Sequence, residues 1–224
     1  MNSNDKNNNV KTYPAPWALK GKGYILLYRF SKKEIQKDPF LSQKFKECFL
    51  GGFGAVMIVD YQKSNAGPYQ ELLFIPGNFS YNEQKKKTIS KIYVSTKASV
   101  LNGIINWAIP KKLAKFTFKD LDTHKETIHV FSEEKEILNI KIKSGRFPFP
   151  VHTTLLPFPL VQERNDKAYY TTFSGSGIGY LAKIMNLSVN NNMFPKIIEK
   201  KPFLCIKVDP FNIYFPKSTI KEID

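Results

Sequence analysis

Two adjacent lysines, Lys111 and Lys112, form the stretch of the sequence with the clearest capacity for chemistry. An amine attacks a carbonyl carbon only when it is unprotonated, and an ordinary lysine of pKa ~10.4 is almost entirely an ammonium ion at neutral pH. Burial and a neighbouring positive charge both lower the pKa of a lysine. The pair therefore indicates either a nucleophilic lysine or, because lysine is abundant throughout this chain, two solvated charges that adjoin by chance.

A second segment upstream, Gly67-Pro68-Tyr69-Gln70-Glu71, forms a pair of motifs with the lysines. Its order and separation from the run Pro110-Lys111-Lys112-Leu113 resemble the acetoacetate decarboxylase family, over about residues 23 to 189. In that family the first lysine of a Pro-Lys-Lys-Leu run forms a Schiff base, and the glutamate of a Gly-x-Tyr-x-Glu segment lies in the site. The resemblance implies that Lys111 is the nucleophile, activated by apolar surroundings or by the charge of Lys112, as is established for this family.

Glu71 then orients the substrate or moves a proton. The alternative is a structural carboxylate that pairs with a lysine. The resemblance also implies that Lys111 and Glu71 approach one another inside a pocket, with Trp107, Phe116 or Tyr69 nearby as apolar walls.

The implied reaction is decarboxylation of a β-keto acid or a related oxo acid through a lysine Schiff base, with no metal or organic cofactor. Aldol or dehydration chemistry through the same intermediate is an alternative. A second class of function is a barrel that binds a small apolar molecule without turnover. Members of the family commonly form homo-oligomers, and we expect the same here.

Several polar groups of the family pattern are missing from this chain. A second glutamate upstream of the first aligns with Val56, and an arginine of the early strand region aligns with Gly21, which Lys20 and Lys22 flank. A common Gly-Arg-Glu triplet corresponds to Gly103-Ile104-Ile105. These losses favour a larger and more apolar oxo acid than acetoacetate.

Periodicity and resemblance disagree about which lysine is buried. A regular strand from Pro110 onward would place Lys112 on the face that carries Ala114 and Phe116, with Lys111 on the opposite face. A bulge or a loop before Ala114 would remove the conflict. We follow the resemblance and assign the nucleophile to Lys111.

Short runs rich in β-branched and aromatic residues predict a mainly β fold. The pattern predicts helices from about Lys32, after the capping-box sequence Ser31 to Glu34, and over 99–107. Together with the resemblance, it predicts a closed or cone-like antiparallel β-barrel of the acetoacetate decarboxylase type around a pocket. Strands are expected at 24–30, 55–61, 69–75, 89–95, 116–119, 127–132, 138–143, 151–156 and 169–173.

Two segments carry residues that disfavour a central strand. The prolines of Phe147-Pro148-Phe149-Pro150 indicate an edge or a connection. The glycines at 174–179 resemble a phosphate-binding loop, but the segment lacks the P-loop lysine and a βαβ unit, so we predict a glycine-rich turn.

The chain of 224 residues is 42% hydrophobic and 14% aromatic, which is enough for one substantial core. We expect a single domain over residues 13–224. Residues 1–12 read as a disordered tail, because they hold almost nothing apolar. Two cysteines and three histidines show no metal-ligand spacing.

The net charge of +15 raises the question of nucleic-acid binding. The basic residues are nearly all lysines, scattered without a basic helix or a recognisable binding motif, so we do not expect a nucleic-acid partner. The sequence has no apolar run of the ~20 residues that span a bilayer, and its first residues are polar. These features predict a cytoplasmic protein without a membrane partner.

Overall fold

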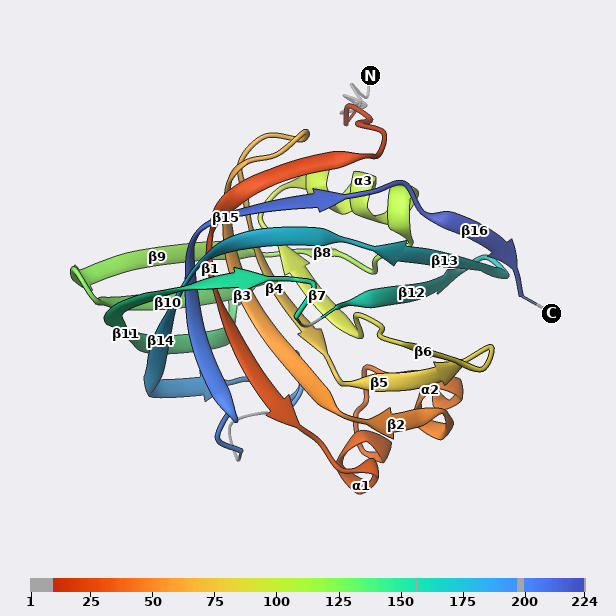
Figure 1. The fold of residues 1–224 in the computed structure, drawn as a ribbon, viewed down its shortest axis with the longest axis horizontal. Helices are drawn as coiled ribbons and strands as arrows, with labels where there is room; N and C mark the ends of the chain where they lie inside the picture. The colour runs from red at the N-terminus through yellow and green to blue at the C-terminus, as the bar shows by residue number, and fades with distance from the viewer. Residues whose placement is uncertain (1–9, 156, 197–199, 224) are drawn as a thin grey trace, which may run out of the picture.

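The computed structural model describes residues 10–155, 157–196 and 200–223, and one large curled sheet dominates it (Figure 1). Neighbouring strands of this sheet pair antiparallel, except for the parallel pair of β7 and β8. The strand order is β8 (Lys112–Leu113), β7 (Lys91–Val94), β4 (Tyr69–Ile75), β3 (Phe53–Lys63), β1 (Trp17–Arg29), β15 (Leu204–Phe215), β14 (Ser174–Val189), β11 (Lys135–His152), β10 (Lys125–Ser132) and β9 (Lys115–Asp122).

Two three-stranded sheets and three helices complete the described fold. One small sheet contains β12 (Pro159–Arg164), β13 (Lys167–Thr172) and β16 (Thr219–Glu222), and the other contains β2 (Phe49–Gly51), β5 (Asn78–Tyr81) and β6 (Gln84–Lys86). The helices are α1 (Lys32–Gln36), α2 (Gln43–Glu47) and α3 (Lys97–Trp107). The mainly β prediction is confirmed, and the capping box of α1 forms at Ser31 and Glu34 as the sequence predicts.

The prediction of a closed barrel is wrong. Strands β8 and β9 are the two edges of the large sheet, and only Ala114 separates them along the chain. The Ala114 amide donates to the carbonyl of Val94 at 2.9 Å, and β9 then pairs with β10. Within the described ranges no ladder of hydrogen bonds joins β8 to β9. The sheet therefore curls into a half-barrel, and its two edge strands are linked by the backbone at Ala114 but do not pair.

The curled sheet buries apolar side chains on both of its faces. Alternate residues of β1, β3 and β4 enter one core with β10 and β11, and the intervening residues enter a second core with α3, β12 and β15. Glu71 belongs to the set of β4 that faces the second core, between Tyr69 and Leu73. The two cores therefore place the candidate carboxylate on the face of the sheet that α3 covers.

The glycine-rich segment at 174–179 is part of β14 and not the turn that we predicted. A β-carbon at Gly177 would lie 2.7 Å from the carbonyl oxygen of Pro210, and one at Gly23 of β1 would lie 2.6 Å from that of Ile58. Both distances are shorter than real contacts allow. These glycines permit close approach between strands at the centre of the sheet.

Strand β11 runs through the proline segment that we expected to be an edge or a connection. Pro148 lies opposite Tyr180 and Pro150 opposite Ile178 on β14, whereas the pairing of β11 with β10 ends at Lys143. This half of β11 has β14 as its one partner strand in the large sheet, so a proline without an N–H is tolerated there. The edge prediction is confirmed. Of the separate strand predicted at 151–156, residues 151 and 152 are the end of β11, residues 153–155 form a turn, and residue 156 lies outside the described residues.

Helix α3 anchors the start of the described chain. The Thr96 side chain accepts from the Ser99 amide at 3.2 Å and caps the helix. The Asn102 amide group donates to the carbonyl of Lys11 at 3.0 Å and accepts from the amide of Tyr13. The predicted tail at 1–12 is thus tied to α3 at Lys11, and residues 1–9 lie outside the described residues.

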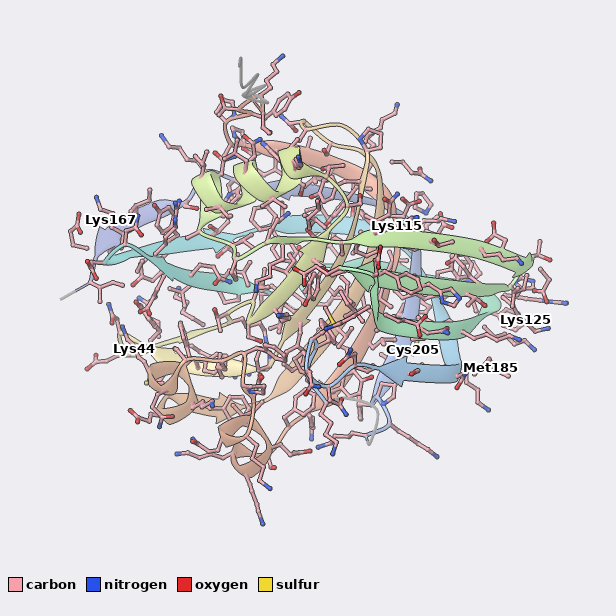
Figure 2. All side chains as sticks on the ribbon, turned by 180° about the vertical axis from the view of Figure 1, so that it is seen from behind. Lys44, Lys115, Lys125, Lys167, Met185 and Cys205 are labelled. Carbon is pink, nitrogen blue, oxygen red and sulfur yellow. The ribbon has the colours of Figure 1, made fainter. Side chains whose placement is uncertain are left out.

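Figure 2 places Lys44 and Lys167 on one side of the molecule and Lys125 on the opposite side. No helix in the described part of the chain is long and apolar enough to cross a membrane.

Lys87 is buried, which corrects the prediction that the charged run Lys85-Lys86-Lys87 belongs to an exposed turn. Its amine donates to the carbonyl of Phe53 at 3.0 Å and to the side-chain oxygen of Asn78 at 2.8 Å. Burial lowers the pKa of Lys87 to about 8, and the charge of Lys85 contributes in the same direction. Lys87 is not among the residues that line the cavity described below.

The lowered pKa of Lys87 predicts that the contribution of Lys87 to the free energy of unfolding depends on pH. Above about pH 8 the folded chain loses this proton while the unfolded chain keeps it up to the ordinary lysine pKa, so the free energy of unfolding rises with pH in that window. Urea denaturation should show that wild type gains stability relative to Lys87→Met between pH ~7 and ~10. The exposed control Lys143→Met should show no such trend, and a constant difference for Lys87→Met would contradict the prediction.

Candidate functional site

Lys111 lies in the turn that connects α3 to the edge strand β8. Helix α3 ends at Trp107, and the next residue, Ala108, caps it in the left-handed conformation, with φ of 53°. The Lys111 amide then donates to the carbonyl of Ile109 at 2.8 Å, and β8 begins only at Lys112. Because Lys111 precedes the strand, strand periodicity does not determine the direction of its side chain.

The Lys111 amine meets the Glu71 carboxylate in the interior of the protein. The distance from Nζ to Oε2 is 2.8 Å, and the two side chains are 4% and 5% exposed. Nζ also donates to the hydroxyl of Ser99 on α3 at 3.1 Å. The amine is thus held between a strand and a helix, at the point where the second core is hollow.

Two tyrosines complete the polar group. The Tyr61 hydroxyl donates to Oε1 of Glu71 at 3.1 Å, and the Lys111 amine lies 5.1 Å from the centroid of the Tyr69 ring. Burial raises the pKa of both tyrosines well above the ordinary value, and the negative charge of Glu71 adds to the effect. For Tyr69 a hydrogen bond with Ser99 acts in the opposite direction. Both phenols therefore stay protonated, and the Tyr61 hydroxyl serves as a hydrogen-bond donor to Glu71.

The stem of Lys111 reaches Glu71 by passing closely over Gly103 of α3. A β-carbon added at Gly103 would lie 2.5 Å from Cδ and 2.7 Å from Cε of Lys111. The glycine therefore provides the space that the buried lysine occupies. This is a physical reason for the glycine of the triplet Gly103-Ile104-Ile105, whose two other members differ from the family pattern.

Gly103→Ala should displace the Lys111 amine without unfolding the protein. Alanine favours the helix by about 1 kcal/mol over glycine, which offsets part of the clash. Misplacing a reacting group by about 1 Å costs up to about 100-fold in rate, so we expect a loss of this order in the activity proposed below. The control is Ile105→Ala, at an exposed position of the same helix. Equal activity in both variants would contradict the role of Gly103.

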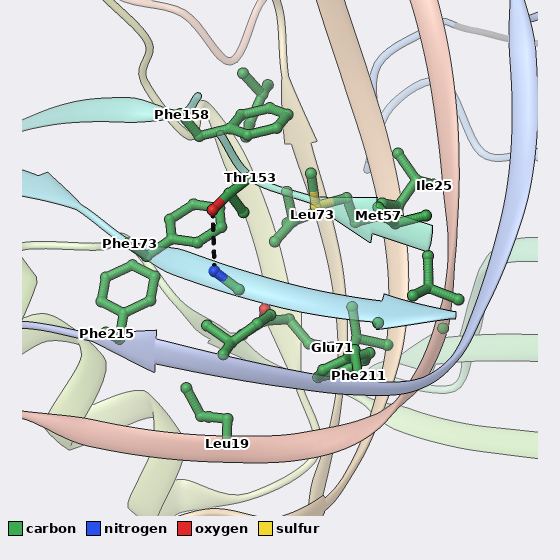
Figure 3. A pocket seen from close by; sticks show the side chains of 18 of the residues that line it. Leu19, Ile25, Met57, Glu71, Leu73, Thr153, Phe158, Phe173, Phe211 and Phe215 are labelled. Atoms are coloured by element: carbon green, nitrogen blue, oxygen red, sulfur yellow. Dashed lines mark hydrogen bonds between the residues drawn. The ribbon is translucent and has the colours of Figure 1, made fainter. Parts of the chain in front are cut away.

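The amine and the carboxylate line a cavity of about 430 Å³. Its walls are almost entirely aliphatic and aromatic, and Lys111 is the sole lysine or arginine among the described residues that line it. Figure 3 shows Glu71 beside Phe211, with Phe158, Phe173 and Phe215 on one side and Met57 and Ile25 on the other. The cavity can therefore hold an apolar molecule against a single pair of opposite charges.

The structure distinguishes the predicted site residues from one another. Lys111, Glu71, Tyr69 and Trp107 all line the cavity, whereas Phe116 packs against the core on the other face of the sheet. Lys112 is exposed and does not line the cavity. Its charge acts on Lys91, whose pKa is lowered by burial and then by Lys112. The candidate role of Lys112 in the site is therefore corrected to that of a surface residue.

No side chain of β1 or β3 restores the missing arginine or the missing second glutamate. Val56 faces the other core, and the residues of β3 that line the cavity are Met57, Val59 and Tyr61. At the arginine position, Lys20 is exposed and Lys22 pairs with Glu126 at 3.4 Å, away from the cavity. The cavity lacks these polar groups as the sequence predicted.

Sequence reasoning missed Tyr61 and Ser99. A signal for Tyr61 was present, because the short connection between β3 and β4 sets it opposite Tyr69. Ser99 precedes Gly103 by one helical turn, and the two form a face of α3 without bulky side chains. Among the described residues, no group of three or more histidine, cysteine or acidic side chains could hold a metal ion.

Solved structures with the same fold include several acetoacetate decarboxylase-like proteins. Acetoacetate decarboxylase from Legionella pneumophila superposes with a TM-score of 0.71 at 13% identity, over 93% of this chain and 88% of that one. An acetoacetate decarboxylase-like enzyme from Sphingomonas wittichii has a TM-score of 0.64 at 10% identity, over 95% of each chain. These similarities show that the chain has an acetoacetate decarboxylase-like fold, which confirms the resemblance at the level of fold.

A third similar structure is that of the enduracididine biosynthesis enzyme MppR, complexed with the condensation product of pyruvate and imidazole 4-carboxaldehyde. Its TM-score is 0.61 at 10% identity, over 93% of this chain and 90% of that one. No protein-family model matches the sequence, and no curated protein is significantly similar to it.

Proposed function

We propose that this protein is a carbon–carbon lyase that decarboxylates an oxo acid through a Schiff base on Lys111. The observation that carries the proposal is the buried pair of Lys111 and Glu71, at 2.8 Å, in an apolar cavity. A buried ion pair seldom stabilises a fold better than apolar side chains would, so its presence in a cavity favours a chemical role. The acetoacetate decarboxylase-like fold of the neighbours supports the same role.

Lys111 and Glu71 can carry out this reaction in the following steps. Glu71 accepts a proton from the Lys111 ammonium, and the free amine adds to the ketone carbon of the substrate. The same proton returns to the carbinolamine oxygen, which leaves as water and produces an iminium ion. The bond to the carboxylate carbon then breaks, its electrons enter the iminium to form an enamine, and carbon dioxide departs. Protonation of the enamine carbon and hydrolysis of the imine release the ketone and the lysine.

The surrounding residues support this sequence of steps. Tyr61 and Ser99 hold the carboxylate and the amine in place through hydrogen bonds at 3.1 Å each. A carboxylate is poorly stabilised among apolar walls, and its loss as neutral carbon dioxide removes the buried charge. Besides Lys111, the described cavity lining contains no lysine or arginine that would stabilise the substrate carboxylate through an ion pair.

An aldol or dehydration reaction through the same iminium is the second candidate. The similar fold of MppR, whose structure contains a condensation product of pyruvate, supports it. Release of carbon dioxide from an oxo acid, measured against condensation with an added aldehyde, distinguishes the two reactions.

Borohydride trapping tests the proposal. Incubation with an oxo acid and borohydride should add one reduced adduct at Lys111, located by mass spectrometry of peptides. Lys87 is the internal control, because it has a lowered pKa but does not line the cavity. Lys111→Met should abolish the adduct and Lys112→Met should retain it. An unmodified Lys111, or adducts spread over exposed lysines, would leave non-catalytic binding of an apolar molecule as the function.

A further inference from the structure

The floor of the cavity is organised in rows that cross neighbouring strands. Glu71 lies in a row with Val59 and Gly23. The next two rows along the strands contain no polar side chain. The first consists of Leu73, Met57, Ile25 and Ile206, and the second of Ile75, Ala55, Leu27 and Leu204.

The opposite end of the cavity is lined by aromatic rings that pack against one another. Phe215 contacts Trp107 with ring centroids 4.8 Å apart, and Phe173 lies 5.3 Å from Phe215 and 5.7 Å from Phe158. Phe173 and Phe215 are half-buried, as are Met57 and Ile25, which line the cavity on the side away from these rings (Figure 3). The aliphatic part of the cavity wall extends from Glu71 towards Met57 and Ile25, whereas the aromatic rings lie on the other side (Figure 3).

We infer that the substrate of Lys111 carries an unbranched apolar tail of about eight to ten carbons, which lies over Leu73, Met57 and Ile25. This inference rests on the proposed function. The distance along β4 from Glu71 to Ile75 is about 13 Å, at ~3.3 Å per residue. An extended hydrocarbon advances about 1.3 Å per carbon at a bond length of ~1.5 Å, which sets the length of the tail.

The substrate class that follows is a 3-oxo acid with a medium-length alkyl chain. The carbonyl carbon lies at the Lys111 amine, and the alkyl chain covers the two apolar rows. Acetoacetate has only a methyl group in place of this chain, so it would leave both rows uncovered. Each methylene that becomes buried in such a site increases affinity by about fourfold.

A ligand series that cannot react tests the tail site separately from the chemistry. Alkan-2-ols have no carbonyl group and form no Schiff base, so their binding reports only the cavity. We expect their affinity, measured by displacement of a fluorescent naphthalene sulfonate, to rise about fourfold per methylene and to level off near ten carbons. An affinity that does not depend on chain length would overturn the inference.

Met57→Trp tests the position of the tail. The larger side chain fills the row beside Ile25, so the rise in affinity should stop several carbons earlier than in wild type. The control is Met185→Trp, at a half-exposed methionine that Figure 2 places at the periphery of the molecule, where the series should be unchanged. Urea denaturation establishes that both variants fold. An unchanged series in folded Met57→Trp would place the tail elsewhere and overturn the inference.

The outcomes separate this inference from the proposed function. A rising series in a protein whose Lys111 is never trapped by borohydride would support the tail site and contradict the Schiff-base reaction. Trapping at Lys111 together with a flat series would support the reaction and overturn the tail.

Discussion

Lys111→Met is expected to lower kcat/KM for the oxo acid by on the order of 10⁴-fold or more, as is usual when the nucleophile of a covalent mechanism is removed. Methionine keeps most of the apolar stem that packs over Gly103 but has no amine. Steady-state release of carbon dioxide measures the effect. The loss should appear in kcat as well as in kcat/KM, because the amine takes part in the reaction and not only in binding.

Lys112→Met is the matched control for this prediction. The two lysines adjoin in sequence, but Lys112 is exposed and does not line the cavity, so its removal should leave turnover close to that of wild type. Comparable losses in both variants would indicate that charge or folding at the turn, and not the buried amine, controls activity. Full turnover in Lys111→Met would rule out the Schiff base altogether.

The local strands and helices were largely predictable from the sequence, because their signals are local. The apolar run of β4 ends at Pro76, and its predicted bounds are those of the structure. Helix α3 begins after a threonine cap and ends near the predicted residue. Such elements depend on side chains within a few residues of one another, which a sequence displays directly.

Strand β15 shows why other elements were missed. It is central to the sheet between β1 and β14, but Pro210 interrupts its sequence pattern. The register with β1 shifts at this point: Gly21 lies opposite Phe211, and Gly23 lies opposite Val208. The irregularity accommodates the proline within a central strand. The register shift that accommodates Pro210 involves the facing strand β1, so the sequence of β15 alone does not reveal it.

The residues of the candidate site were also predictable only in part. The motifs named Lys111 and Glu71, and the structure brings their charged groups within 2.8 Å. Assigning the buried lysine by strand periodicity would have selected Lys112, because that reasoning assumed a strand where the chain makes a turn. Ser99 and Gly103 act through the packing of α3 against this turn, which no spacing in the sequence specifies.

Removing one member of the buried ion pair is expected to destabilise the protein far more than removing both. Glu71→Leu leaves the ammonium of Lys111 without its carboxylate, and breaking such a pair costs about 3–5 kcal/mol of unfolding free energy. In Lys111→Met/Glu71→Leu no buried charge remains, so stability should return close to that of wild type. Urea denaturation of the four proteins gives the coupling free energy between the two residues.

The same cycle on the exposed pair of Lys167 and Glu222, which are 3.1 Å apart, is the control and should give a small coupling. Additive losses at Lys111 and Glu71 would show that the two charges do not depend on each other in solution. A double variant that is stable but inactive would show that this pair serves the reaction and is not required for the fold.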